Sequence, residues 1–452
     1  MGIRLKQIAA QYHPVVWWIV GATAVTRITQ FMVMPFLALY MAVHTHAGTA
    51  TIGLAIGMAA LTSTVFGFIG GPFADKYGRK GIMVLAMIIS AVALAGFANA
   101  RVTWVFFVLS ALNGLTRTLF GPASQAMLTD VTSPELRSNV FAMRYWAINV
   151  GASMGPVVGG YLGTVATGWT FYLAAAVSGL YGIVILLIFP ESSKLGAERA
   201  ERPVLMKTMQ TMKTILGKYF HPVQSGKARR AEFKNRTAKK GANLPEITFR
   251  KALQTVFADK ALLLFVLATI FSNIGYSQVE STLPQFMGQM FTSHLAARTY
   301  AWVLTSNAVE VVILQLPLTK ITNKFGLIPS MVLGQVLFGI GYVGLGFSTG
   351  LWSFVASMLV VTMGEIIVFP RNSEYLSVLA PDNLRATYFG ASTLRSIGFF
   401  LGPWIGGWML GKAGGPAVFT VIAGVAAVAA PFYVWSNHVR HHVEKSTESM
   451  VL

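Results

Sequence analysis

The chain has 452 residues, of which 54% are hydrophobic and only 11% are charged, with a mean hydropathy of +0.60 and a formal net charge of +19. Soluble domains carry roughly 25% charged residues and disordered chains have low hydrophobicity, so the composition excludes an ordinary soluble enzyme and a disordered chain. The absence of Cys excludes a disulfide framework, a thiolate metal site and a cysteine nucleophile.

Apolar runs follow one another along most of the chain. A spanning helix needs about 20 mostly apolar residues, and each of these runs is of about that length. They predict an all-α membrane protein with twelve transmembrane helices, over residues 15–41, 51–72, 81–99, 103–128, 139–162, 169–189, 261–287, 299–318, 327–347, 352–378, 388–410 and 416–436.

The basic residues are concentrated in the polar segments on one side of these helices. Residues 191–251 hold 15 Lys and Arg against 5 Asp and Glu, which favours a basic linker resting near anionic lipid over a nucleic-acid or regulatory site. Because cytoplasmic loops collect Lys and Arg, the pattern predicts that both termini are cytoplasmic. The opposite loops hold little beyond Arg101, Arg298 and Lys412.

The two halves of the chain repeat each other. The pattern Gly151-x3-Gly155-Pro156-x2-Gly159-Gly160 returns 247 residues later, beginning at Gly398. The repeat predicts a six-helix half over residues 1–190, a linker over 191–252 and a second six-helix half over 253–452. Parallel repeats of this kind place a substrate site near the bilayer midplane, between the halves.

A motif rich in charge and glycine lies between the second and third predicted helices, from Gly71 to Lys80. Gly78 permits a tight turn there. The pattern G-x-x-x-D-x-x-G-R-K resembles the signature loop of the major facilitator superfamily. The resemblance implies a gate latch that is made by Asp75, Arg79 and Asp130. The counterpart in the second half, which begins at Asn323, lacks both the Asp and the Arg, so we expect an asymmetric latch.

The fifth predicted helix carries two overlapping G-x-x-x-G steps, which indicate close helix packing. With Pro156, the run Gly151, Gly155, Gly159 and Gly160 resembles the helix-5 motif of drug/proton antiporters in the superfamily. The same pattern recurs in the eleventh helix, so repeat symmetry accounts for part of the signal. On this motif, antiport is favoured over symport, and symport is kept as the alternative.

Ionisable residues inside membrane helices are costly and usually have a function. Three acids, Glu280, Glu310 and Glu365, fall well inside the seventh, eighth and tenth predicted helices. A carboxyl group that alternates between a dry and a charged environment can take up and release a proton. We expect these acids to carry proton and substrate charge, with Arg27 and Arg117 tuning them, although a static ion pair is the alternative for each.

The seventh helix contains Glu280 followed by Ser281-Thr282-Leu283-Pro284, which resembles MdtH-like multidrug exporters. This resemblance makes Glu280 the first choice for the coupling site. The start of the fifth helix is also similar to proton-dependent oligopeptide transporters. Members of that family carry an E-x-x-E-R motif in helix 1. Here Arg27 is present but both acids are missing, which counts against peptide symport.

Taken with the resemblance, the sequence predicts a proton-coupled exporter of amphiphilic or cationic small molecules. The alternative is a proton symporter that imports peptides or another nutrient. We expect no enzymatic activity, no metal and no cofactor besides the proton gradient, because no nucleotide-binding loop or catalytic triad is found. The expected partners are the small-molecule substrate, protons and lipid, with no nucleic acid. We expect a monomer in the bacterial cytoplasmic (inner) membrane.

Overall fold

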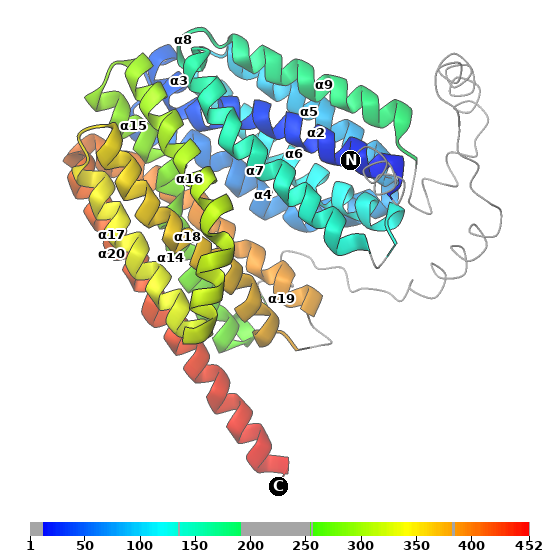
Figure 1. Cartoon of the computed structure of the whole chain (residues 1–452), viewed down its shortest axis with the longest axis vertical. Coiled ribbons are helices and arrows are strands. Elements are labelled where there is room, and N and C mark those ends of the chain that lie inside the picture. Colours follow the sequence, from blue (N-terminus) through cyan, green and yellow to red (C-terminus); the bar gives the residue numbers. More distant parts are fainter. Residues whose placement is uncertain (1–11, 134–135, 191–253, 255, 382–384, 452) are drawn as a thin grey trace, which may run out of the picture.

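The computed structural model describes the chain outside residues 1–11, 134–135, 191–253, 255, 382–384 and 452 (Figure 1). The described residues form helices and connecting turns, with no strand among them. The predicted all-α class is therefore confirmed. The basic linker predicted over 191–252 lies outside the described residues.

The first half is built from helices joined by short turns. Its first span is broken by a 3-10 turn, because Pro35 lacks the backbone N–H that an α-helix would use there. The elements are α2 (Pro14–Val33), η1 (Met34–Phe36), α3 (Leu37–His44), α4 (Thr49–Tyr77), α5 (Arg79–Asn99), α6 (Thr103–Val131), α7 (Arg137–Tyr161), α8 (Thr164–Thr167) and α9 (Trp169–Ile188).

The second half repeats this order. Its first span is also broken, at Ser281, three residues before Pro284. The elements are α14 (Lys260–Glu280), α15 (Thr282–Met290), α16 (Ser293–Thr322), η3 (Asn323–Phe325), α17 (Leu327–Phe347), α18 (Leu351–Leu379), α19 (Arg385–Ala391), η4 (Ser392–Ser396) and α20 (Ile397–Val451).

Ten helical segments of the described chain are long and apolar enough to cross a membrane. The last of them has non-helical backbone at Gly414, so it consists of two helices. Helix α7 is not among the ten because Arg137, Arg144 and several polar residues lower its hydropathy. Counting α7, and counting α20 as two helices, accounts for the twelve predicted spans.

Tight turns at equivalent positions join the second and third helices of each half. Gly78 has φ 96° between α4 and α5, and Gly326 has φ 79° between η3 and α17. Both values lie in the region that glycine adopts without strain, which confirms the turn predicted at Gly78.

The two halves contact each other at one end of the molecule, which we call the closed end. Figure 1 shows α3, α8 and α15 gathered there, while the helices of the two halves diverge toward their other ends. Phe36 packs edge-on against Tyr300 with ring centroids 5.7 Å apart. Phe36, Leu39 and Val165 of the first half belong to the same buried apolar cluster as residues of the second half.

The most extensive contacts between the halves are those of α4 with α20 and of α7 with α16. The hydroxyl group of Thr49 donates a hydrogen bond of 2.6 Å to the carbonyl oxygen of Gly407. On the other side, the indole N–H of Trp302 donates to the hydroxyl oxygen of Tyr161 at 3.2 Å. The closed end is thus held by apolar packing and by direct polar contacts.

Candidate functional site

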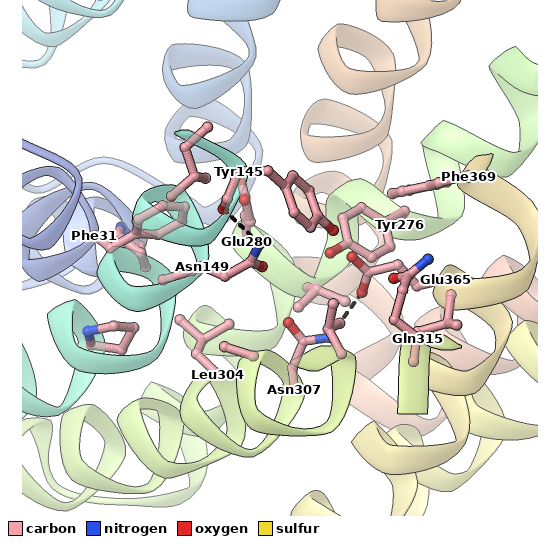
Figure 2. Close-up of a pocket in the computed structure, with 18 of the residues that line it drawn as sticks. Phe31, Tyr145, Asn149, Tyr276, Glu280, Leu304, Asn307, Gln315, Glu365 and Phe369 are labelled. Carbon is pink, nitrogen blue, oxygen red and sulfur yellow. Dashed lines mark hydrogen bonds between the residues drawn. The ribbon is translucent and has the colours of Figure 1, made fainter. Parts of the chain in front are cut away.

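A cavity of about 450 Å³ lies between the two halves, and we call it the central cavity (Figure 2). It is bordered by α2 and α7 of the first half and by α14, α16 and α18 of the second half. Its wall is mostly apolar and aromatic, with two acids and no Lys or Arg. The lining residues are Phe31, Pro35, Tyr145, Ile148, Asn149, Ala152, Pro156, Tyr276, Val279, Glu280, Leu304, Asn307, Ala308, Val311, Gln315, Glu365, Ile366, Phe369 and Pro370.

Glu280 lies at the break in the seventh span, where α14 ends. Pro284 has no N–H to offer to the carbonyl group of Glu280, so the α-helical ladder stops at that point. The Glu280 side chain is exposed to the cavity and makes no hydrogen bond within the described part of the chain. The sequence therefore places this acid where it can meet a solute directly.

Glu365 has a more constrained position on α18. Its carboxylate accepts a hydrogen bond of 2.8 Å from the side-chain amide of Asn307 on α16, and the same amide also donates to the hydroxyl oxygen of Thr362 at 2.9 Å. Tyr276 from α14 lies beside Glu365, with its hydroxyl group toward the carboxylate (Figure 2). Three helices of the second half thus meet at this carboxylate.

Glu310 lies on α16, one helical turn from Asn307, but it does not line the central cavity. Its side chain is only 6% exposed, and neither carboxylate oxygen has a hydrogen-bond partner among the described residues. Burial away from the central cavity thus distinguishes Glu310 from Glu280 and Glu365.

The two predicted tuning arginines lie elsewhere. Arg27 on α2 and Arg117 on α6 line a second cavity of about 290 Å³ inside the first half, together with Arg144 of α7. Arg27 donates a hydrogen bond of 2.7 Å to the side-chain oxygen of Gln30. The structure therefore brings Glu280 and Glu365 into one cavity and places Arg27 and Arg117 in another.

The predicted gate latch is partly described. Arg79, at the start of α5, forms an ion pair with Asp130 near the end of α6, and it donates to the carbonyl oxygen of Ala126 at 3.3 Å. Gly71 and Asp75 lie in α4, but the surroundings of both residues are outside the described part of the structure. The ion pair between Arg79 and Asp130 is thus observed, whereas its role as a gate latch and the part of Asp75 stay predictions.

At the equivalent turn of the second half, the charged residues come from a different helix. Arg371, which is buried on α18, donates to the side-chain oxygen of Asn323 and forms an ion pair with Glu374 on its own helix. The cation thus comes from α18 and not from the start of α17. This arrangement agrees with the asymmetry expected from the loss of Asp and Arg in this loop.

The glycines of α7 form a seam against α2. A Cβ atom on Gly151 would lie 2.4 Å from Cβ of Arg27, and one on Gly155 would lie 2.6 Å from Cβ of Phe31. At Gly159 it would lie 2.1 Å from the carbonyl oxygen of Met32. Pro156 lies on the same helix and lines the central cavity. The close packing predicted from the G-x-x-x-G steps is therefore present.

The last glycine of the run has a different partner. A Cβ atom on Gly160 would lie 2.7 Å from Cβ of Ala301 on α16, which belongs to the other half. In the repeat, Gly398 and Gly402 pack on α14, whereas a Cβ atom on Gly407 would lie 2.3 Å from the carbonyl oxygen of Thr49 on α4. In both copies, the last glycine thus contacts the opposite half at the closed end.

Sequence reasoning missed Asn307, which holds Glu365. Asn307 precedes Glu310 by three residues on α16, and a polar residue one turn from an acid in an apolar helix was a usable signal. It also missed Tyr145 and Asn149, which line the central cavity from α7. These side chains lie one turn apart, and Asn149 donates to the carbonyl oxygen of Tyr145 at 2.9 Å.

Comparison with known proteins agrees with this architecture. A sequence model described as Major Facilitator Superfamily matches residues 19–296 and 287–449. The MFS-type transporter YqjV of Bacillus subtilis is 32% identical over 427 residues, covering 94% of each chain. A Na(+), Li(+), K(+)/H(+) antiporter of Planococcus maritimus is 28% identical, covering 90% of this chain and 92% of that one.

A more distant relative is the multidrug resistance protein MdtH of Yersinia pestis. It is 23% identical, covering 84% of this chain and 82% of that one. Among solved structures, the nucleoside transporter NupG superposes with a TM-score of 0.71 at 14% identity, covering 94% of this chain and 99% of that chain. At that identity, the superposition shows the shared fold alone.

Proposed function

This chain belongs to the Major Facilitator Superfamily, a family of transporters, and from that premise we propose that it exports amphiphilic or cationic small molecules in exchange for protons. It is a multi-pass membrane protein and a secondary transporter. The substrate class, the direction of transport and the coupling ion are the proposed properties. It places the chain in the bacterial cytoplasmic membrane.

The observation that carries the proposal is the chemistry of the central cavity. Two acids, Glu280 and Glu365, face it, and no Lys or Arg lines it. Phe31, Tyr145 and Phe369 add aromatic surface, and aromatic faces attract organic cations. A flat, apolar solute with a positive charge would satisfy both the acids and the rings.

The closed end supports alternating access. The halves contact each other at Phe36 and Tyr300 and diverge toward the opposite ends of their helices (Figure 1). Arg101 lies in a turn at the closed end, where it donates to the hydroxyl oxygen of Tyr40, whereas Arg79 begins α5 and Lys324 lies in η3, both at the other end. From the positive-inside rule we infer that the basic end is cytoplasmic, which would make the conformation described inward-facing.

Coupling follows from the differing environments of the acids. Glu280 is exposed to the cavity, where either a proton or a cationic solute can neutralise it. If the two compete for the carboxylate, proton entry displaces the solute and export becomes tied to the gradient. Each pH unit then supplies about 1.4 kcal/mol per proton.

The relative from Planococcus maritimus introduces a second candidate, the exchange of alkali cations for protons. The same two acids support it, because hard cations prefer oxygen ligands. The aromatic wall of the central cavity favours the organic cation, since aromatic side chains supply no carboxylate or carbonyl ligand for a metal ion.

Everted membrane vesicles from a host that lacks its own exporters test the proposal. Energised vesicles containing the protein should accumulate ethidium, and a proton uncoupler should abolish the accumulation. If NaCl or KCl instead discharges an acid-inside gradient, followed by acridine orange fluorescence, while ethidium is not accumulated, the alkali-cation candidate replaces the proposal. Proton-driven peptide uptake by whole cells without dye export would favour the importer.

A further inference from the structure

The second cavity, inside the first half, has a charge that the proposed function does not use. It lies between α2, α5, α6, α7 and α9 and has a volume of about 290 Å³. Arg27, Arg117 and Arg144 reach it from three different helices, and none of its lining residues is acidic. We call it the arginine cavity.

These three cations have no acidic partner in the part of the chain that the structure describes. Ion pairs among the described residues, such as Arg79 with Asp130 and Arg371 with Glu374, lie in other clusters. Because all three arginines line one cavity of about 290 Å³, their like charges repel one another. Burying cations near one another inside a membrane is costly, and a counter-anion would relieve that cost.

Two hydrogen-bond donors among the residues that line the cavity are also unused in the described part of the chain. Within the described residues, the hydroxyl group of Tyr181, whose side chain is only 4% exposed and lines the cavity, has no hydrogen-bond partner. Nε of Arg144 has none there either, while another nitrogen of that guanidinium group donates to the hydroxyl oxygen of Ser124 at 3.4 Å. The hydroxyl groups of Thr26 and Thr116 donate to carbonyl oxygens of their own helices. The cavity thus presents free donors and positive charge to any occupant.

We propose that the arginine cavity binds an oxyanion, a carboxylate or phosphate group, through the guanidinium groups of Arg27, Arg117 and Arg144 and the hydroxyl group of Tyr181. Guanidinium donors match the planar, two-oxygen face of such groups. The volume is near the lower end for small-molecule pockets, so the site takes a small anion or the anionic end of a larger solute.

Binding of a free anion in the arginine cavity does not depend on the proposed function. Binding of an anionic group of the transported solute does rest on the proposed function, and it extends that function. The acids of the central cavity and the arginines of the first half carry opposite charges, as the two ends of a zwitterionic solute would require. The same oxyanion can come from free phosphate or from the solute itself. The binding experiment distinguishes these sources.

Thermal unfolding of the purified full chain in detergent tests the site without any transport. Sodium phosphate or sodium acetate, added at ionic strength held constant with NaCl, should raise the unfolding midpoint in a saturable way. Arg144→Gln and Tyr181→Phe should each weaken the apparent affinity for phosphate by about tenfold. Arg144→Lys keeps the charge but loses the planar donor pair, and should also weaken it.

Arg298→Gln is the matched control, because Arg298 lies on α16 at the closed end, over the ring of Tyr161. In this variant, phosphate should raise the unfolding midpoint as much as it does in wild type. Each variant is first required to unfold cooperatively without anion, at a midpoint close to that of wild type. The proposal is overturned if phosphate and acetate give no saturable shift, or if Arg298→Gln and Arg144→Gln lose it equally.

Two dyes then identify the source of the oxyanion. Rhodamine B has a free carboxylate, and its ethyl ester does not. Tighter binding of rhodamine B, lost in Arg144→Gln and reduced by phosphate, assigns the oxyanion to the solute. If phosphate instead strengthens the binding of the ethyl ester, the oxyanion in the arginine cavity is a free anion. Failure of vesicles to accumulate ethidium, with the phosphate shift intact, overturns the proposed function and leaves this site standing.

Discussion

Glu280 and Glu365 face the same cavity but differ in their surroundings. The carboxylate of Glu365 is held by Asn307 and lies beside Tyr276, whereas Glu280 is exposed at the end of α14 with no side-chain hydrogen bond in the described region. A group without fixed partners can exchange a proton for a cationic solute at lower cost. We therefore propose that proton and solute compete at Glu280 and that Glu365 has a positioning role.

Changing Glu280 to Gln should separate binding from coupling. The amide resembles the protonated acid permanently, so the variant should move dye down its gradient but fail to concentrate it. With one proton per dye, wild type gains about tenfold accumulation per pH unit, and Glu280→Gln should lose this factor. Everted vesicles with an imposed pH gradient measure it.

Glu374→Gln is the matched control for this experiment. Glu374 lies on α18, the helix of Glu365, but it pairs with Arg371 and does not line the central cavity. It should accumulate dye as wild type does. If Glu280→Gln also concentrates dye like wild type, Glu280 is not the coupling site, and Glu310 or Glu365 takes its place.

At the scale of single elements, α7 depends on its glycines for its position against α2. Gly151, Gly155 and Gly159 occur at intervals of four, so they share one face of the helix. That face lies on backbone and Cβ atoms of α2, which cannot move aside as the end of a flexible side chain can. The seam therefore sets the distance between two helices that border both cavities.

Gly155→Leu should abolish transport. Even a Cβ atom would lie 2.7 Å from the carbonyl oxygen of Ile28 and 3.0 Å from the backbone nitrogen of Met32, so the two helices must separate. Overpacking of a tight contact costs about 1–3 kcal/mol, which should also lower the unfolding midpoint in detergent. Dye transport and thermal unfolding are the two measurements.

Gly424→Leu on α20 controls for the loss of a helix glycine. No atom lies within 4 Å of a Cβ atom built there, so this variant should be stable and active. Equal transport by the two variants would show that α7 does not need a close approach to α2.

The turn between α4 and α5 is a second element for which the structure allows a prediction. Arg79 and Asp130 already join α5 to α6, and the resembled latch adds Asp75 from α4. Asp75→Asn should impair transport without affecting membrane insertion, because it removes one charge of this group. Insertion is measured by the amount of protein in the membrane fraction, and transport by dye efflux from cells.

Asn323→Asp in the second half is the comparison. Asn323 accepts a hydrogen bond from Arg371, and an acid there would still accept it. This variant should transport better than Asp75→Asn. Equal sensitivity of the two positions would contradict the asymmetric latch.

At the scale of the whole molecule, the closed end depends on contacts that are possible only without side chains. On α4, a Cβ atom on Gly53 would lie 1.9 Å from the carbonyl oxygen of Pro403, and one on Gly57 would lie 2.6 Å from that of Phe400. Gly407 makes the reciprocal approach from α20 toward Thr49. If the halves part at this end, these contacts are lost.

Gly407→Leu should therefore favour the conformation in which the closed end is open. Because the chain has no Cys, a single Gln315→Cys in the central cavity gives a clean reporter. In everted vesicles, a membrane-impermeant maleimide should label this Cys well, and Gly407→Leu should slow the labelling several-fold as the halves close around it.

Gly424→Leu again serves as the control and should label like the parent protein. If Gly407→Leu leaves the labelling rate unchanged, the contact between α4 and α20 does not decide which end of the molecule is open. The same membranes can be assayed for dye transport, which should fall in Gly407→Leu because alternating access needs both conformations.

The sequence by itself determined the helical class, the order of the spans and the repeat, because hydropathy and glycine spacing are local properties. It also predicted the turn at Gly78 and the close packing of α7. It treated 15–41 and 261–287 as continuous, whereas the structure breaks both spans, at Met34 and at Ser281. Pro35 and Pro284 were the local signals for those breaks.

Only the tertiary structure decided which polar groups meet. Glu280, Arg27 and Arg117 look alike in sequence, as single charges in apolar runs. The structure separates them into two cavities because the face that each helix turns inward depends on packing between distant segments. The same dependence explains why Asn307 meets Glu365, and why the last glycine of each repeat contacts the opposite half and not its own.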